Sequence, residues 1–136
     1  MHVNFESVRE EDFYDIQLDV DGCRDIYESF RQYTRRELLE GANQYDAGEG
    51  LGKQDAEKGL AFSQLPPILT IHLKRFHFDM RKMGFSKIHD YFAFPLHLNM
   101  AEFLANRNSN GDSADSNSRY SLHSVLVHSV FGTIIF

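Results

Sequence analysis

The sequence predicts an α+β fold in which short antiparallel strands pack with one main helix. Segments 12–20 and 65–76 alternate apolar and polar residues with the period of a strand, while segment 25–40 repeats apolar residues at helical spacing. The chain of 136 residues is 42% apolar and contains 12 Phe and 6 Tyr, enough material for one hydrophobic core. A single folded domain is therefore the expectation.

The first half predicts a strand, a turn and a helix. In "FYDIQLDV" the residues alternate from Phe13 to Val20, and Asp21-Gly22 then supplies a turn signal. Asp25 is placed to cap a helix that runs to about Glu40, and Gly41 is a plausible left-handed stop. Residues 41–59 hold five glycines and predict an irregular or hairpin-like excursion, with one helical turn at 54–58.

The second half predicts further strands joined by loops. Residues 65–76 form a central strand whose prolines stand at its entrance, where they cost no ladder hydrogen bond. Residues 79–87 predict a connecting loop, and 88–94 a strand that ends at Pro95. The composition of 106–119 predicts a disordered insertion, and 121–129 predict a late strand that needs a partner.

Composition narrows the class of partner and compartment. A formal charge of -6 argues against a generic nucleic-acid surface and suits a basic protein partner. The N-terminal segment lacks the pattern of a signal peptide, and no stretch approaches the ~20 apolar residues of a membrane span, so no membrane partner is expected. One cysteine excludes an internal disulfide framework, which favours a reducing compartment such as the nucleus or the cytoplasm.

Few residues are candidates for catalysis, metal binding or contact with a partner. Cys23 is the one possible thiol nucleophile, but Asp19, Asp21 and Asp25 surround it with negative charge that opposes thiolate formation, so an incidental turn cysteine is favoured. The seven histidines show no zinc-binding motif, so neither a metal nor another cofactor is expected. Lys74-Arg75 in "LKRFHF" fits either a stacking platform for nucleic acid or a contact with a protein partner.

The segment "LPPILTIHLKRFHFD" closely resembles the L-P-x-x-L-x-x-x-L-x-R-F strand of ubiquitin-specific proteases. "FYDIQLDVDGCRDIYESF", "ELLEGANQYDAGEGLGKQDAEKGLAF", "KIHDYFAFP" and "YSLHSVLVHS" resemble further family segments in the same order. Ala47 and Gly50 stand where other members have two zinc-binding cysteines. That replacement is similar to the subgroup containing the herpesvirus-associated ubiquitin-specific protease.

The resemblance implies a papain-like cysteine protease superfamily fold, of which this chain holds the fingers and palm. Enzymes of the family cleave the isopeptide bond after the C-terminal glycine of ubiquitin, using a Cys, a His and an Asp or Asn. The family's G-x-x-N-x-G-x-T-C-Y box is absent, and Val130 follows His128-Ser129 where the family continues toward its catalytic histidine. We therefore expect no catalytic residue here and no hydrolysis by this chain alone.

The resemblance implies that this chain recognises ubiquitin and ubiquitinated proteins. It implies that Arg75, Phe76 and Phe78 face the C-terminal tail of ubiquitin and that His128 lies near the same cleft. Residues 80–87 then correspond to a blocking loop over the tail. Tyr14 and Asp15 belong to the palm and fingers that hold the globular body of ubiquitin.

The expected domain organisation is a partial family domain over residues 1–129 and a non-family tail over 130–136. Three other interpretations remain open. The chain could be a noncatalytic ubiquitin-binding module, or a truncated product that folds poorly because 121–129 lacks its partners. It could also be an intact enzyme of another class that uses Cys23.

Overall fold

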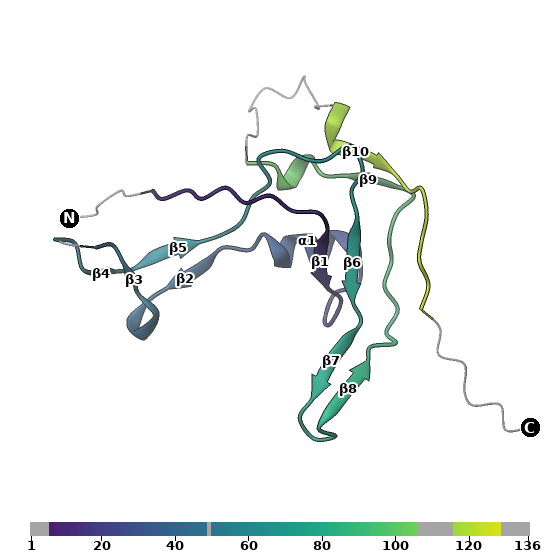
Figure 1. Ribbon diagram of the computed structural model, residues 1–136, viewed down its shortest axis with the longest axis horizontal. Coiled ribbons are helices and arrows are strands. Elements are labelled where there is room, and N and C mark those ends of the chain that lie inside the picture. Colours follow the sequence, from purple (N-terminus) through teal and green to yellow (C-terminus); the bar gives the residue numbers. More distant parts are fainter. Residues whose placement is uncertain (1–5, 49, 106–115, 129–136) are drawn as a thin grey trace, which may run out of the picture.

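The computed structural model describes residues 6–48, 50–105 and 116–128 and confirms the α+β class. Over these residues the chain forms one α-helix, ten short strands and three 3-10 turns. Figure 1 shows a central strand pair beside the helix, an arm of thin strand pairs on one side and a hairpin that projects away from the centre. None of the described helices is long and apolar enough to cross a membrane.

The central pair joins β1 (Ile16–Asp19) to β6 (Ile71–Lys74), and its strands are parallel rather than antiparallel as expected. The register pairs Ile16 with Ile71 and Asp19 with Lys74. A parallel pair needs a long crossover connection, and the residues between β1 and β6 supply it. The two strands lie inside the predicted segments 12–20 and 65–76, but each is only four residues long.

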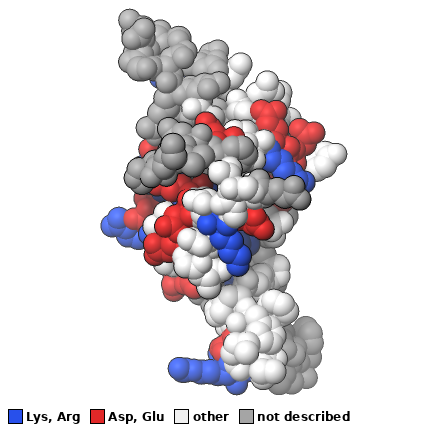
Figure 2. Space-filling view, turned by 90° about the vertical axis from the view of Figure 1, so that its left-hand side faces the viewer, with Lys and Arg blue, Asp and Glu red and all other residues white. Residues whose placement is uncertain are grey.

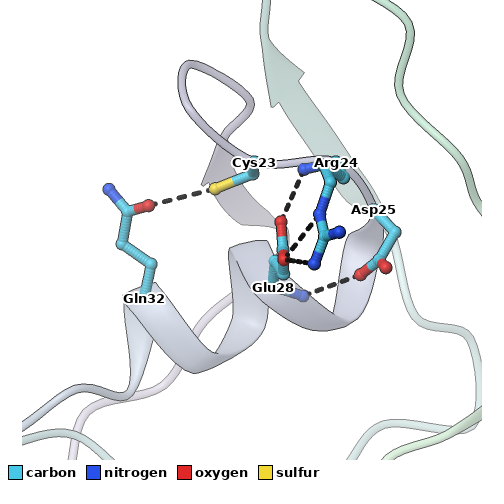
Figure 3. A network of polar contacts seen from close by, with 5 residues as sticks. All are labelled: Cys23, Arg24, Asp25, Glu28 and Gln32. Carbon is cyan, nitrogen blue, oxygen red and sulfur yellow. Dashed lines mark hydrogen bonds and ion pairs between the residues drawn. The ribbon is translucent and has the colours of Figure 1, made fainter.

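Helix α1 (Ile26–Tyr33) begins where the sequence predicted, at the N-cap Asp25. The Asp25 carboxylate accepts a hydrogen bond from the backbone N–H of Glu28 at 2.9 Å. The Glu28 carboxylate in turn accepts one from the backbone N–H of Arg24 at 2.7 Å and two from the Arg24 guanidinium, at 3.0 and 2.6 Å (Figure 3). Two backbone donors near the start of the helix are thereby satisfied by side chains.

The predicted helical extension to Glu40 is wrong. The helix ends at Tyr33, and the Thr34 hydroxyl donates to the carbonyl of Phe30 at 2.9 Å. The next residues form β2 (Glu37–Leu39), which pairs antiparallel with β5 (Ala56–Lys58). Pairing with a distant strand therefore replaced a local helical turn, and only tertiary structure supplies that partner.

The arm confirms the hairpin-like excursion expected over 41–59. Strands β3 (Tyr45–Asp46) and β4 (Lys53–Gln54) form an antiparallel pair beyond the β2–β5 pair. The helical turn expected at 54–58 is wrong, because these residues enter β4 and β5. Gly41 has the expected left-handed φ of +61°, but it begins the 3-10 turn η1 (Gly41–Asn43) instead of ending the helix.

Residues 76–87 form an antiparallel hairpin, so the connecting loop expected at 79–87 is wrong. Strand β7 (Phe76–Asp79) pairs with β8 (Gly84–Lys87), and Phe78 lies opposite Phe85. The Asp79 carboxylate organises the turn by accepting from the backbone N–H groups of Arg81 at 2.9 Å and Lys82 at 3.3 Å. The strand expected at 88–94 is absent, and within that segment only an isolated bridge joins Asp25 to Ala93.

The C-terminal part contains the antiparallel pair β9 (His97–Asn99) and β10 (Arg119–Ser121), with η2 (Ala101–Phe103) and η3 (Ser116–Ser118) between them in sequence. Residues 106–115 of the predicted insertion lie outside the described residues. Its last four residues, 116–119, lie in η3 and at the start of β10. The late strand stops at Ser121, and the described residues 122–128 are not in a strand.

The core forms where α1 packs on β1 and on the segments around β9 and η2. The rings of Phe30 and Phe103 have centroids 5.1 Å apart, and Phe62 meets Phe30 edge-to-face at 6.2 Å. Ile16, Leu18 and Val20 are buried as the alternation predicts, whereas Tyr14 is exposed because β1 begins only at Ile16. The buried apolar residues are Ile16, Leu18, Val20, Cys23, Ile26, Phe30, Phe62, Ile88, Phe92, Leu98, Met100 and Phe103.

Replacing Phe30 tests this core. Phe30 is 0% exposed, so Phe30→Ala should lower the free energy of unfolding by about 3–5 kcal/mol, through lost burial and an internal cavity. Tyr91→Ala is the control, because Tyr91 is 87% exposed and its loss should change stability by less than about 0.5 kcal/mol. Urea unfolding followed by circular dichroism measures both, and equal effects would contradict the described core.

Glu28 predicts a specific pH dependence. The hydrogen bond from the Arg24 side chain lowers the pKa of Glu28 below its ordinary value of 4.5. A carboxylate with a lowered pKa stabilises the fold above the unfolded pKa and loses that contribution as the pH falls through the folded pKa. Glu28→Gln should therefore destabilise the protein at pH 7, and the difference from the wild type should vanish as the pH falls below 4.5.

The Arg24→Ala background is the matched control for this pH effect. Without the guanidinium, the pH dependence of the Glu28→Gln difference should shrink, because only the backbone hydrogen bond from position 24 and the charge of Arg31 remain to lower the pKa of Glu28. Thermal melts between pH 3 and 7 measure all four proteins. A difference that keeps its full size in acid would show that the charge of Glu28 contributes nothing.

Candidate functional site

Arg75 stands at the joint between the central pair and the hairpin. Its backbone N–H donates to the carbonyl of Leu73 at 2.8 Å, and its own carbonyl accepts from the N–H of Ile88 at 2.6 Å. The guanidinium donates from Nη1 to the carbonyls of Ile88 at 3.3 Å and Asp90 at 3.0 Å. Its central carbon lies 6.0 Å from the centroid of the Phe92 ring. Arg75 therefore braces the chain on both sides of the hairpin.

Phe76 and His128 come together although 52 positions separate them in the sequence. Their rings meet edge-to-face with centroids 5.5 Å apart. The ammonium group of Lys87 donates to the backbone carbonyl of His128 at 2.7 Å and lies 3.3 Å from Nδ1 of the same residue. Because an ammonium group can only donate, the contact with Nδ1 is a hydrogen bond when that nitrogen is the acceptor.

One face of the hairpin is largely aromatic and open to solvent, with Lys87 opposite Phe76 as its charged member. Residues two apart on a strand, and residues opposite each other in the ladder, share a face, which places Phe76, Phe78 and Phe85 together. Phe78 and Phe85 meet edge-to-face with centroids 5.6 Å apart, yet they are 47% and 78% exposed. Met80 and Met83 add exposed side chains at the turn. We call these five residues, Phe76, Phe78, Met80, Met83 and Phe85, the hairpin surface.

The rest of the molecule differs from the hairpin surface in its distribution of charged side chains. Figure 2 shows acidic and basic side chains intermixed over the body, whereas the lower projection is mostly uncharged and carries basic atoms near its end. Arg81 and Lys82 occupy the turn of the hairpin. Clustered apolar side chains exposed in this way are typical of a surface that meets a partner.

Tyr14 and Asp15 lie away from the other candidate residues. Both precede β1 and are exposed, Tyr14 by 98%. Because β1 and β6 are parallel and in register, the start of β1 lies beside the start of β6, while Arg75 follows the far end of β6. The structure thus brings Arg75, Phe76, Phe78 and His128 together and holds Tyr14 and Asp15 at the opposite end of the central pair.

The sequence did not reveal the role of Lys87 or the pairing of Phe85 with Phe78. The contact between Lys87 and His128 spans 41 positions, so no local pattern indicates it. A signal for Phe85 was present, because "FHFD" and "GFSK" are two short segments separated by a turn of four residues. The four turn residues, 80–83, contain no glycine or asparagine turn signal, which favoured a loop instead.

The surroundings of Cys23 are not those of a catalytic nucleophile. Its side chain is 8% exposed, and its Sγ donates to Oε1 of Gln32 at 3.0 Å (Figure 3). Gln32 has an amide, which cannot act as the general base that a thiol nucleophile needs. Over the described residues, no three His, Cys, Asp or Glu side chains gather in a way that could hold a metal ion.

Comparisons with known proteins agree on one family. The family model described as ubiquitin carboxyl-terminal hydrolase matches residues 5–133. Ubiquitin C-terminal hydrolase 12 of Arabidopsis thaliana is 46% identical over 129 residues, which cover 95% of this chain and 12% of that protein. Ubiquitin carboxyl-terminal hydrolase 7 of Drosophila melanogaster is 44% identical, over 94% of this chain and 11% of that protein. This chain thus spans about 12% of the length of these relatives.

Solved structures lead to the same family. The SAGA Ubp8/Sgf11/Sus1/Sgf73 DUB module bound to ubiquitin aldehyde matches with a TM-score of 0.63 and 31% identity, over 72% of this chain and 21% of that chain. The SAGA DUB module bound to monoubiquitin matches with a TM-score of 0.60 and 32% identity, over 69% of this chain and 21% of that chain. The predicted boundary between a family domain and a tail at 129/130 stays a prediction, and its tail lies outside the described residues.

The sequence pattern, the α+β architecture with its projecting hairpin and both kinds of comparison therefore converge, and this chain belongs to the ubiquitin carboxyl-terminal hydrolase family as a fragment of its domain.

Proposed function

We propose that this chain is the ubiquitin-recognition part of a deubiquitinase, and that its hairpin surface receives the C-terminal tail of ubiquitin. The observation that carries the proposal is the exposed aromatic face of β7–β8, held beside His128 by the Lys87 contact. Two matched structures hold ubiquitin or its aldehyde, which supports ubiquitin as the partner. The parent enzyme would cleave the isopeptide bond after the C-terminal glycine of ubiquitin.

In this proposal the residues of the site have separate roles. Phe76 and Phe78 supply apolar contact to the tail, since half-exposed aromatic rings lose water-accessible area when a partner covers them. Arg75 acts through its hydrogen bonds to the carbonyls of Ile88 and Asp90, which set the path of the chain next to the hairpin. His128 extends the same face through its contact with Phe76.

The second group of residues would contact a different part of ubiquitin. Tyr14 presents a fully solvated ring, and Asp15 adds a negative charge beside it. Both stand at the end of the central pair that is remote from Arg75. A basic face on the globular body of ubiquitin would complement this end electrostatically, which favours orientation and the rate of association over affinity.

Chemistry is not part of the proposed role of this chain. Cleavage by a cysteine protease needs a thiolate, a histidine base and a donor for the oxyanion. The one cysteine is nearly buried and hydrogen-bonded to an amide. We therefore propose that the chain by itself binds ubiquitin without hydrolysing its conjugates.

Two further parts of the proposal concern the subgroup of the family and the cellular compartment. The residues Ala47 and Gly50, in positions where other family members carry cysteines, support the subgroup that contains the herpesvirus-associated ubiquitin-specific protease. The use of one cysteine in 136 residues favours a reducing compartment, so we propose the nucleus, the cytoplasm or both.

Binding to isotope-labelled ubiquitin tests the recognition proposal. Addition of the 136-residue chain should shift the NMR signals of the C-terminal tail of ubiquitin. Phe76→Ala should weaken binding at least about fivefold, or about 1 kcal/mol, because it removes a central aromatic contact. Tyr14→Ala should instead reduce shifts on the globular body of ubiquitin, because Tyr14 lies at the other end of the central pair.

Leu60→Ala is the matched control for the binding experiment. Leu60 is 44% exposed, close to the 50% of Phe76, but it lies in the segment between β5 and Phe62. Its replacement should leave ubiquitin binding within about twofold of the wild type. No shifts on ubiquitin at millimolar chain concentration would sink the proposal, and an equal effect of both substitutions would remove the hairpin from it.

A ubiquitin probe with an alkylating C-terminus tests the absence of catalysis. The folded chain should not form a covalent adduct, because the Cys23 thiol is 8% exposed and donates its hydrogen to Gln32. Iodoacetamide in denaturant should label Cys23 fully, which controls for a thiol already lost to oxidation. Mass spectrometry reads both reactions, and a specific adduct of the probe with Cys23 would instead support an intact enzyme of another class.

A further inference from the structure

The sulfur atoms of the described chain fall into two environments. Met80 and Met83 are 74% and 72% exposed at the turn of the hairpin. Met100 is 0% exposed in the core, and Cys23 is 8% exposed with its thiol hydrogen-bonded to Gln32. Within the part of the chain that the structure describes, an oxidant in solvent therefore meets the two hairpin thioethers first.

The hairpin turn does not depend on the methionine side chains for its shape. The Asp79 carboxylate accepts from the backbone N–H groups of Arg81 and Lys82, and Asp79 and Gly84 close the ladder on either side. Met83 holds a left-handed φ of +49°, which is a property of the backbone. A chemical change on either sulfur would thus alter the surface of the turn while its backbone stays in place.

The two thioethers lie where apolar character matters for the proposed function. Met80 follows β7 directly after Phe78 and Asp79, and Met83 precedes β8 with Phe85 two positions later. The rings of Phe78 and Phe85 are in edge-to-face contact on the hairpin surface. An exposed methionine at this turn offers a flexible apolar side chain to a partner, and conversion to the sulfoxide makes it polar.

We propose that Met80 and Met83 form a reversible oxidation site that lowers the affinity of the hairpin surface for the ubiquitin tail. The oxidant is a peroxide. A sulfur lone pair attacks one peroxide oxygen and the O–O bond breaks, which releases hydroxide. The hydroxide takes the proton of the oxygen now bound to sulfur, so that the sulfoxide S=O and one water result. The sulfur loses two electrons to the peroxide. A methionine sulfoxide reductase with a thiol reductant reverses the change.

The modification itself is tested on the folded chain without ubiquitin. After timed exposure to dilute hydrogen peroxide, peptide mass spectrometry should show Met80 and Met83 oxidised at least about tenfold faster than the buried Met100. Circular dichroism should remain that of the untreated chain while only the hairpin is oxidised. Oxidation of Met100 at the rate of the hairpin methionines would overturn the proposal.

The functional half, which rests on the proposed binding of ubiquitin, is tested by titrating labelled ubiquitin with treated and untreated chain. Treatment should weaken binding about fivefold or more, and methionine sulfoxide reductase with dithiothreitol should restore it. The control is the double variant Met80→Leu/Met83→Leu, and its peroxide-treated form is compared only with its own untreated form. Peroxide should change the affinity of this variant for ubiquitin less than about twofold.

The outcomes separate the two proposals. An untreated wild type that fails to bind ubiquitin contradicts the proposed function, while the oxidation rates still decide whether the hairpin is a modification site. Ubiquitin binding that is unaffected by complete oxidation of Met80 and Met83 overturns the proposed effect of oxidation and leaves the proposed function standing. Equal sensitivity of the double leucine variant assigns the effect to another residue and overturns it as well.

Discussion

The parallel pairing of β1 with β6 is the constraint on which the rest of the structure depends. Its register buries Ile16 and Leu18 beneath α1 and sets which residues emerge at each end of the pair. The ion pair between Lys74 and Asp19, at 2.7 Å, lies at the same end as Arg75. Both partners are substantially exposed, so this contact contributes little free energy, and burial of the apolar face holds the pair.

Arg75 converts that central pair into a platform for the hairpin. If β6 continued straight beyond Lys74, its alternation of apolar and polar residues would continue along the same line. Instead, Arg75 donates hydrogen bonds to the carbonyls of Leu73, Ile88 and Asp90, and the chain changes direction there. The hairpin that follows stands clear of the core, with its aromatic residues uncovered. Arg75 thus positions the hairpin through intramolecular hydrogen bonds, and its predicted contact with ubiquitin stays a prediction.

The proposed recognition surface and the single thiol lie in different parts of the described structure. The hairpin surface, Lys87 and His128 form a continuous arrangement built from segments that are far apart in sequence. The single thiol lies elsewhere, at the start of α1, where it contributes to the local network of the helix. The oxidation proposed for the methionines of the turn would need no catalytic cysteine.

By itself, the sequence determined the features that local physics controls: the buried alternation of β1, the Asp25 cap, the glycine-rich arm and, through its motifs, the family. Tertiary structure decided the features that need a distant partner. The helix ended at Tyr33 because β2 pairs with β5, the loop at 79–87 became a hairpin, and 122–128 stayed outside any strand. Backbone hydrogen bonds and apolar faces need partners, and which segments meet is a property of the whole fold.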